Sequence, residues 1–111
     1  MKRYALALDL VDDEKLIAEY EAYHKAIWPE IEESIRSAGI LNMEIYRVAN
    51  RLFMVMEVAN DFSFEAKAKA DGSNPKVQEW EALMWKYQQA LPTAKRGEKW
   101  LMMDKIFQLN S

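Results

Sequence analysis

The run of residues 52–58, with the sequence LFMVMEV, constrains the fold most strongly, because it is apolar on both of its alternating faces. In an extended strand successive side chains point to opposite sides, so Phe53 and Val55 share one face and the even-numbered residues share the other. A strand of this kind is typical of the centre of a sheet that is covered on both sides. The chain has 111 residues, and we expect a single domain over residues 1–111.

The rest of the chain alternates between strand-like and helix-like patterns. Strands are predicted over residues 4–10, 43–48, 52–58 and 100–109, and helices from residue 14 to the break at Pro29 and over 30–38, 63–70 and 74–91. Asp12 or Asp13 can cap the first helix, and Gly39 can end the second. Residues 49–51 predict a hairpin turn, because Asn50 tolerates left-handed backbone.

With the short helices grouped beside the longer ones, the order of elements is β-α-β-β-α-β. This is the ferredoxin-like pattern of the α+β class, a sandwich in which helices pack on one face of an antiparallel sheet. The other face has to stay solvated, bind a ligand or meet a second subunit. Because the strands are so apolar, we expect two sheets to face one another in a homodimer, forming a dimeric α+β barrel.

The residue types that are missing exclude several function classes. Without cysteine, and with one histidine and no tight carboxylate cluster, the sequence supports neither a thiol nucleophile nor a metal site. Three glycines provide no phosphate-binding loop. A net charge of −3 gives no general attraction to nucleic acid or to a membrane surface. The apolar start of the chain ends at Asp9, which is too early for a signal peptide, so we expect a cytoplasmic protein.

His24 is the only histidine and the first candidate for chemistry. A neutral imidazole near pH 7 can both accept and donate a proton. Tyr20 lies four residues earlier, so the two side chains share one face of the predicted helix and can bracket a ligand that carries hydroxyl groups. The alternative is that His24 is an ordinary structural or surface histidine, as single histidines often are.

Tryptophans supply the second candidate feature. Trp80 and Trp85 lie on the second long helix, and Trp100 begins the last predicted strand. A tryptophan ring can stack against the apolar face of a sugar while its N–H donates a hydrogen bond. For any one of these rings taken alone, ordinary core packing is the favoured interpretation, since each buries a large area.

Residues 20–31, with the sequence YEAYHKAIWPEI, resemble the L-rhamnose mutarotase family. The spacing of Tyr20 and His24, followed by IWPE, is specific. The resemblance covers most of the chain and is weakest over residues 60–74. It continues at Gly39, Asn42, Ile45-Tyr46, 52–54, 77–80, Leu91-Pro92 and 106–109.

The resemblance implies a ferredoxin-like homodimer that interconverts sugar anomers without a metal or other cofactor, acting on a monosaccharide. By matching position, the proton donor of the family falls on His24 and its sugar-contacting tyrosine on Tyr20. The tryptophan motif of the family falls on Trp80, with Trp85 as its neighbour. The resemblance also implies that the cavity lies beside an exchanged C-terminal segment, which links the dimer to activity.

Two positions depart from the family pattern and leave the choice of sugar open. Met43 stands where the family has a sugar-binding tyrosine, and Glu81 stands where it has a second tryptophan. L-Rhamnose, L-fucose or another 6-deoxy sugar can therefore be the substrate. Two other functions compete with the mutarotase. One is a cofactor-free or haem-dependent monooxygenase on the same dimeric scaffold, and the other is a non-catalytic module that binds a small ligand.

Overall fold

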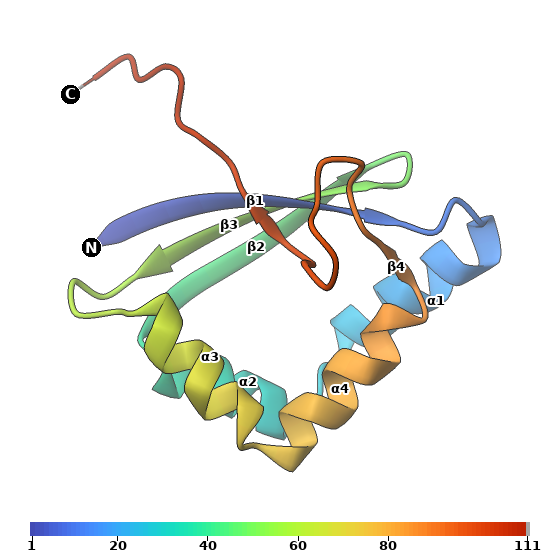
Figure 1. Ribbon diagram of the computed structural model, residues 1–111, viewed down its shortest axis with the longest axis horizontal. Helices are drawn as coiled ribbons and strands as arrows, with labels where there is room; N and C mark the ends of the chain where they lie inside the picture. Colours follow the sequence, from blue (N-terminus) through green and yellow to red (C-terminus); the bar gives the residue numbers. More distant parts are fainter. Residues whose placement is uncertain (111) are drawn as a thin grey trace.

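The computed structural model describes residues 1–110 and places all of its helices on one side of an antiparallel sheet (Figure 1). In chain order the elements are β1 (Lys2–Leu10), α1 (Glu14–Lys25), α2 (Pro29–Ser37), β2 (Ile40–Val48), β3 (Arg51–Val58), α3 (Phe64–Gly72), α4 (Pro75–Trp85), β4 (Gln88–Gln89) and β5 (Leu101–Met102). The predicted ferredoxin-like α+β arrangement is confirmed. No helix in the described part of the chain is long and apolar enough to cross a membrane.

Strand β1 lies at the centre of the sheet, whose strand order is β2-β3-β1-β4. It pairs with β3 over eight residue pairs, from Lys2↔Val58 to Asp9↔Arg51. The register is fixed at one end by two hydrogen bonds from the Arg51 guanidinium to the Asp9 carboxylate, of 2.7 and 3.1 Å. On its other edge, β1 pairs with β4 and, further along, with β5.

The strand predicted over residues 52–58 is confirmed as β3, and its two faces differ in burial. The even-numbered residues face the helices and are buried, whereas Phe53 remains 37% exposed on the open face. The inward residues of β1 join the same core, and the helices close it. The buried hydrophobic residues are Leu6, Leu8, Leu10, Tyr20, Ile31, Ile40, Leu52, Met54, Met56, Val58, Val77, Trp80, Met84 and Tyr87.

Polar side chains cap the N-termini of three of the four helices. The side chains of Asp13 and Ser63 accept hydrogen bonds from backbone N–H groups in the first turns of α1 and α3, and Asn74 does the same for α4. Pro29 occupies the first turn of α2, where a missing N–H has no cost. Gly39 follows α2 with a φ of 93°, which is the left-handed conformation expected of a residue that ends a helix.

The predicted turn over residues 49–51 is real, but its details differ. Arg51 already belongs to β3, so Ala49 and Asn50 alone form the loop. Ala49, and not Asn50, takes the left-handed conformation, with a φ of 51°. The Asn50 side chain instead donates a hydrogen bond to the carbonyl of Leu10 at 3.1 Å, and so ties the hairpin to the end of β1.

The C-terminal third departs furthest from the predictions. The helix predicted over 74–91 ends at Trp85, because Tyr87 and Gln88 turn into the sheet and become buried there. The strand predicted over 100–109 is wrong beyond Met102. Two short segments, β4 and β5, fill the edge beside β1 instead. The Met103 N–H still donates a hydrogen bond to the Ala5 carbonyl of β1, and residues 104–110 lead away from the sheet without regular structure (Figure 1).

The hairpin generates a stability prediction. Left-handed backbone is costly for alanine and free for glycine, so Ala49→Gly should raise the free energy of unfolding by about 1 kcal/mol. Urea denaturation measures this change. Ala22→Gly, at an exposed position within α1, is the matched control and should lower it by about 1 kcal/mol. A loss of stability in Ala49→Gly would contradict the assigned turn.

Candidate active site

A cavity of about 560 Å³ lies between the helices and the covered face of the sheet. This volume is within the usual range for sites that bind small molecules. The cavity has apolar walls with a few polar groups. Its lining includes Tyr20, His24, Ile31, Ile45, Met54, Trp80, Met84, Gln88 and Trp100, and towards its edge Glu32, Arg36, Asn42, Lys67, Asp71 and Glu81.

His24 lies in the last turn of α1 and is held in one orientation by its own helix. Its Nδ1 donates a hydrogen bond of 2.8 Å to the backbone carbonyl of Tyr20. Because a carbonyl oxygen only accepts, Nδ1 carries the proton of the neutral ring. Nε2 then has a free lone pair, so it is the nitrogen that can accept a proton from a ligand.

Burial keeps the pair of His24 and Tyr20 uncharged near pH 7. Desolvation lowers the pKa of His24 from its ordinary value of 6.5, and the hydrogen bond to the Tyr20 carbonyl only partly offsets this. Desolvation raises the pKa of the Tyr20 hydroxyl above 10.0, against a smaller opposite effect of Gln88. The cavity wall therefore presents a neutral base beside a neutral phenol, which is a suitable pair for moving protons.

Trp80 forms the aromatic wall next to this pair. Its ring centroid lies 5.7 Å from that of His24, and the two rings meet edge to face. Trp28 and Tyr23 contact the same ring at centroid distances of 5.0 and 6.1 Å and hold it in place. Trp80 is only 8% exposed, so it contributes to the core as well as to the cavity.

The structure brings together three of the four predicted site residues. Tyr20, His24 and Trp80 all line the cavity, but Trp85 does not. The Trp85 ring is 38% exposed on the surface of α4 and lies under the ammonium group of Lys99 at 4.8 Å. Residues 80 and 85 are five apart, which turns their side chains to different faces of the helix.

Sequence reasoning missed Gln88 and did not assign Trp100 to the site. Gln88 was expected inside a helix, whereas in β4 its side chain reaches the cavity. Its Nε2 donates a hydrogen bond of 3.3 Å to the Tyr20 hydroxyl. The two positions that depart from the family pattern, Met43 and Glu81, also line the cavity, so both are placed to affect which ligand fits.

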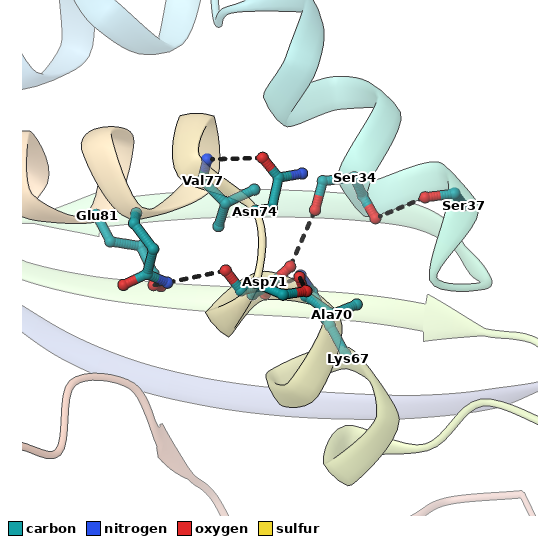
Figure 2. A network of polar contacts seen from close by, with 10 residues as sticks. Ser34, Ser37, Lys67, Ala70, Asp71, Asn74, Val77 and Glu81 are labelled. Atoms are coloured by element: carbon teal, nitrogen blue, oxygen red, sulfur yellow. Dashed lines mark hydrogen bonds and ion pairs between the residues drawn. The ribbon is translucent and has the colours of Figure 1, made fainter.

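A polar network joins α2, α3 and α4 at the edge of the cavity (Figure 2). Asp71, near the end of α3, accepts a hydrogen bond from the Ser34 hydroxyl of α2 at 3.0 Å and pairs with Lys67 at 2.6 Å. Its backbone carbonyl accepts a hydrogen bond from Gln78 of α4 at 2.9 Å. Because the ion pair is mostly shielded from water, the network holds the helix layer in register around the cavity.

The lowered pKa of His24 can be measured directly, since a single histidine gives a single ring resonance. An NMR titration should find its midpoint below 6.5. The folded state prefers the neutral ring, so its free energy of unfolding should fall as pH drops below 6.5 and protons bind more readily to the unfolded chain. His24→Ala should remove that part of the pH dependence. A midpoint at or above 6.5 would contradict the burial of the ring.

Comparison with known proteins relates the chain to sugar mutarotases. The family model for L-rhamnose mutarotase matches residues 3–109. The chain is 46% identical to an L-fucose mutarotase of Xanthomonas campestris, over 99% of this chain and 90% of that protein. It is 35% identical to an L-rhamnose mutarotase of Shigella flexneri, over 62% of this chain and 61% of that protein.

A solved structure shows the same fold. The crystal structure of an L-rhamnose mutarotase from Formosa agariphila superposes with a TM-score of 0.72 at 20% identity, covering 98% of this chain and 99% of that one. The family match extends over nearly the whole chain and includes Tyr20, His24 and Trp80. The chain therefore belongs to the L-rhamnose mutarotase family, whose members are carbohydrate isomerases.

Proposed function

We propose that the protein interconverts the α and β anomers of a free 6-deoxy-L-hexose, with L-fucose as the first candidate and L-rhamnose as the second. L-Fucose comes first because the L-fucose mutarotase of Xanthomonas campestris is more similar to this chain, and over more of its length, than the L-rhamnose mutarotase of Shigella flexneri. L-Fucose and L-rhamnose differ in configuration at C2 and C4. Met43 and Glu81 line the cavity at the two positions where the family pattern is broken, which is consistent with a changed sugar preference.

One observation carries the proposal. His24 lies in an apolar cavity with Nδ1 held by the Tyr20 carbonyl, which leaves Nε2 as an uncharged base, and the Tyr20 ring is 4.3 Å away between centroids. Anomer exchange needs one group that takes a proton and another that gives one, both near the anomeric carbon. Trp80 beside them offers an aromatic surface of the kind on which sugar rings stack.

The reaction follows from these two groups. His24 Nε2 takes the proton of the anomeric hydroxyl, and the electron pair left on that oxygen forms the carbonyl of the open aldehyde. The bond between C1 and the ring oxygen breaks, and the ring oxygen takes the proton of the Tyr20 hydroxyl. After the aldehyde rotates about its C1–C2 bond, both protons return and the ring closes on the other face.

This chemistry requires only the groups already in place. General acid–base catalysis by a well-positioned side chain contributes roughly 10²–10⁴-fold to a rate. Burial keeps both groups neutral, so His24 is free to accept a proton and Tyr20 still carries one to donate. In this proposal the whole chain acts as one domain. We also propose that it acts in the cytoplasm.

The first test is anomer exchange measured by saturation-transfer NMR on L-fucose and L-rhamnose. The wild-type protein should accelerate exchange, with a higher kcat/KM for L-fucose. His24→Ala should lose about 10²–10⁴-fold while keeping its fold, as checked by circular dichroism. Lys25→Ala, at the exposed neighbouring position, is the matched control and should keep full activity. Full activity in His24→Ala would overturn the assignment.

The second part of the proposal concerns assembly: we propose a homodimer formed through the open face of the sheet. That face carries a shallow depression lined by apolar and charged side chains. Tyr46, Val48 and Phe53 are 53, 73 and 37% exposed there, although each is apolar or aromatic. A second copy of the chain would cover this surface on both partners at once.

The C-terminal segment supports the same partner. Ile106, Phe107 and Leu109 are 95, 68 and 83% exposed, on a segment that leads away from the sheet (Figure 1). Three large apolar side chains so close in sequence and so exposed indicate a surface that is covered in the assembly. We propose that they pack on the second subunit.

Light scattering on dilute protein tests the dimer. The wild-type mass should be close to twice the 13.0 kDa of one chain. Phe53→Glu and a Phe107→Glu variant should each weaken association, since a carboxylate would have to be buried in the interface. Ala18→Glu, on the exposed surface of α1, should leave the dimer intact. A monomeric wild-type protein that still exchanges anomers would refute both the dimer and its link to activity.

A further inference from the structure

Gln88 is the one residue of the described chain with a buried polar side-chain atom that has no partner. Its side chain is more than nine-tenths buried, and Oε1 is neither exposed to solvent nor hydrogen bonded. Gln88 lines the same cavity as His24. Buried polar atoms without a partner are rare in native proteins, so an acceptor of this kind beside a cavity points to a donor that arrives with a ligand.

Gln88 is held in place at its backbone and at its amide nitrogen. Strand β4 holds its backbone, because Gln88 is paired with Leu10 of β1. Nε2 donates a hydrogen bond of 3.3 Å to the Tyr20 hydroxyl. With its oxygen accepting from Gln88, that hydroxyl directs its own proton elsewhere, which suits a donor to the substrate.

The hydrogen bond to Tyr20 accounts for the amide nitrogen of Gln88, but nothing in the fold accounts for its oxygen. The cavity wall also contains Met84 and Trp100, and an apolar residue such as methionine would fit such a wall without leaving an acceptor unpaired. An unsatisfied polar group that lowers stability and lies at a site is typical of a residue kept for function.

We propose that Gln88 is a substrate-binding residue whose Oε1 accepts a hydrogen bond from a hydroxyl of the sugar while its Nε2 holds the Tyr20 hydroxyl as a donor. This inference rests on the proposed function and extends it, because it makes one secondary hydroxyl of the sugar a requirement for binding. Sugars offer hydroxyl donors at several carbons, and a fixed acceptor distinguishes one from another.

The first experiment compares Gln88→Met with the matched control Gln89→Met, which changes the exposed neighbour on the same strand. Gln88→Met should raise KM for L-fucose about tenfold, because the sugar loses its acceptor, and should lower kcat by a smaller factor, because the Tyr20 hydroxyl loses its hydrogen-bond donor while His24 is untouched. Its melting temperature should change little, because the unpaired acceptor and the hydrogen bond to Tyr20 are removed together. Gln89→Met should match the wild type in kcat and KM.

The second experiment uses the wild-type protein and does not depend on any variant folding. Singly deoxygenated analogues of L-fucose, each lacking the hydroxyl at C2, C3 or C4, are tested for exchange and for binding by tryptophan fluorescence. One analogue should bind to the wild type about tenfold more weakly than L-fucose does. The same analogue and L-fucose should bind to Gln88→Met equally well. That loss of discrimination identifies the sugar hydroxyl that donates a hydrogen bond to Oε1.

The outcomes separate this proposal from the proposed function. Wild-type exchange with unchanged KM in Gln88→Met would overturn the role of Gln88 and leave the mutarotase intact. A parallel loss of melting temperature and kcat in Gln88→Met, with no analogue discriminated, would also overturn it, as a purely structural effect. Sugar binding without exchange, with affinity lowered in Gln88→Met, would support the role of Gln88 in binding and contradict the mutarotase activity. Neither binding nor exchange of any sugar would overturn both.

Discussion

The pairing of β1 with its neighbours on both edges is the constraint on which the rest of the structure depends. One edge holds β3, with its register fixed at Asp9 and Arg51, and the other holds β4. The first pairing presents the inward residues of both strands to the helices and so creates the covered face. The second carries Gln88 to Tyr20. The same central strand therefore positions β3, whose Met54 lines the cavity, and brings in a residue 68 positions away from Tyr20.

The chemistry of His24 follows from its place on α1 rather than from any distant partner. The helix supplies the Tyr20 carbonyl one turn earlier, which fixes the tautomer, and the packing of Trp80 across the ring supplies the desolvation that lowers the pKa. Tyr20 comes from the same face of the same helix. The spacing of four residues thus places a base beside a phenol, and burial against an aromatic wall keeps both of them neutral.

Much of this could be predicted from the sequence, because its local signals agree with the fold. The apolar faces of β1 and β3, the cap at Asp13, and the placement of Tyr20 and His24 on one helix face all depend on neighbours in the chain. The C-terminal part could not be predicted, since the end of α4 and the short β4 are set by burial of Tyr87 and Gln88 against α1 and β1. Trp85 lies outside the cavity lining for a different reason: two tryptophans five residues apart on one helix point to different faces, and the position of the cavity decides which ring enters it.

The central claim is that neutral His24 acts as the base in anomer exchange. The most direct measurement is the pH dependence of kcat/KM for L-fucose, compared with the NMR midpoint of the His24 ring in the free protein. We expect kcat/KM to fall at low pH with a midpoint below 6.5 that coincides with the ring titration. A midpoint at 6.5 or higher, or a profile without an acid limb at the His24 midpoint, would contradict it.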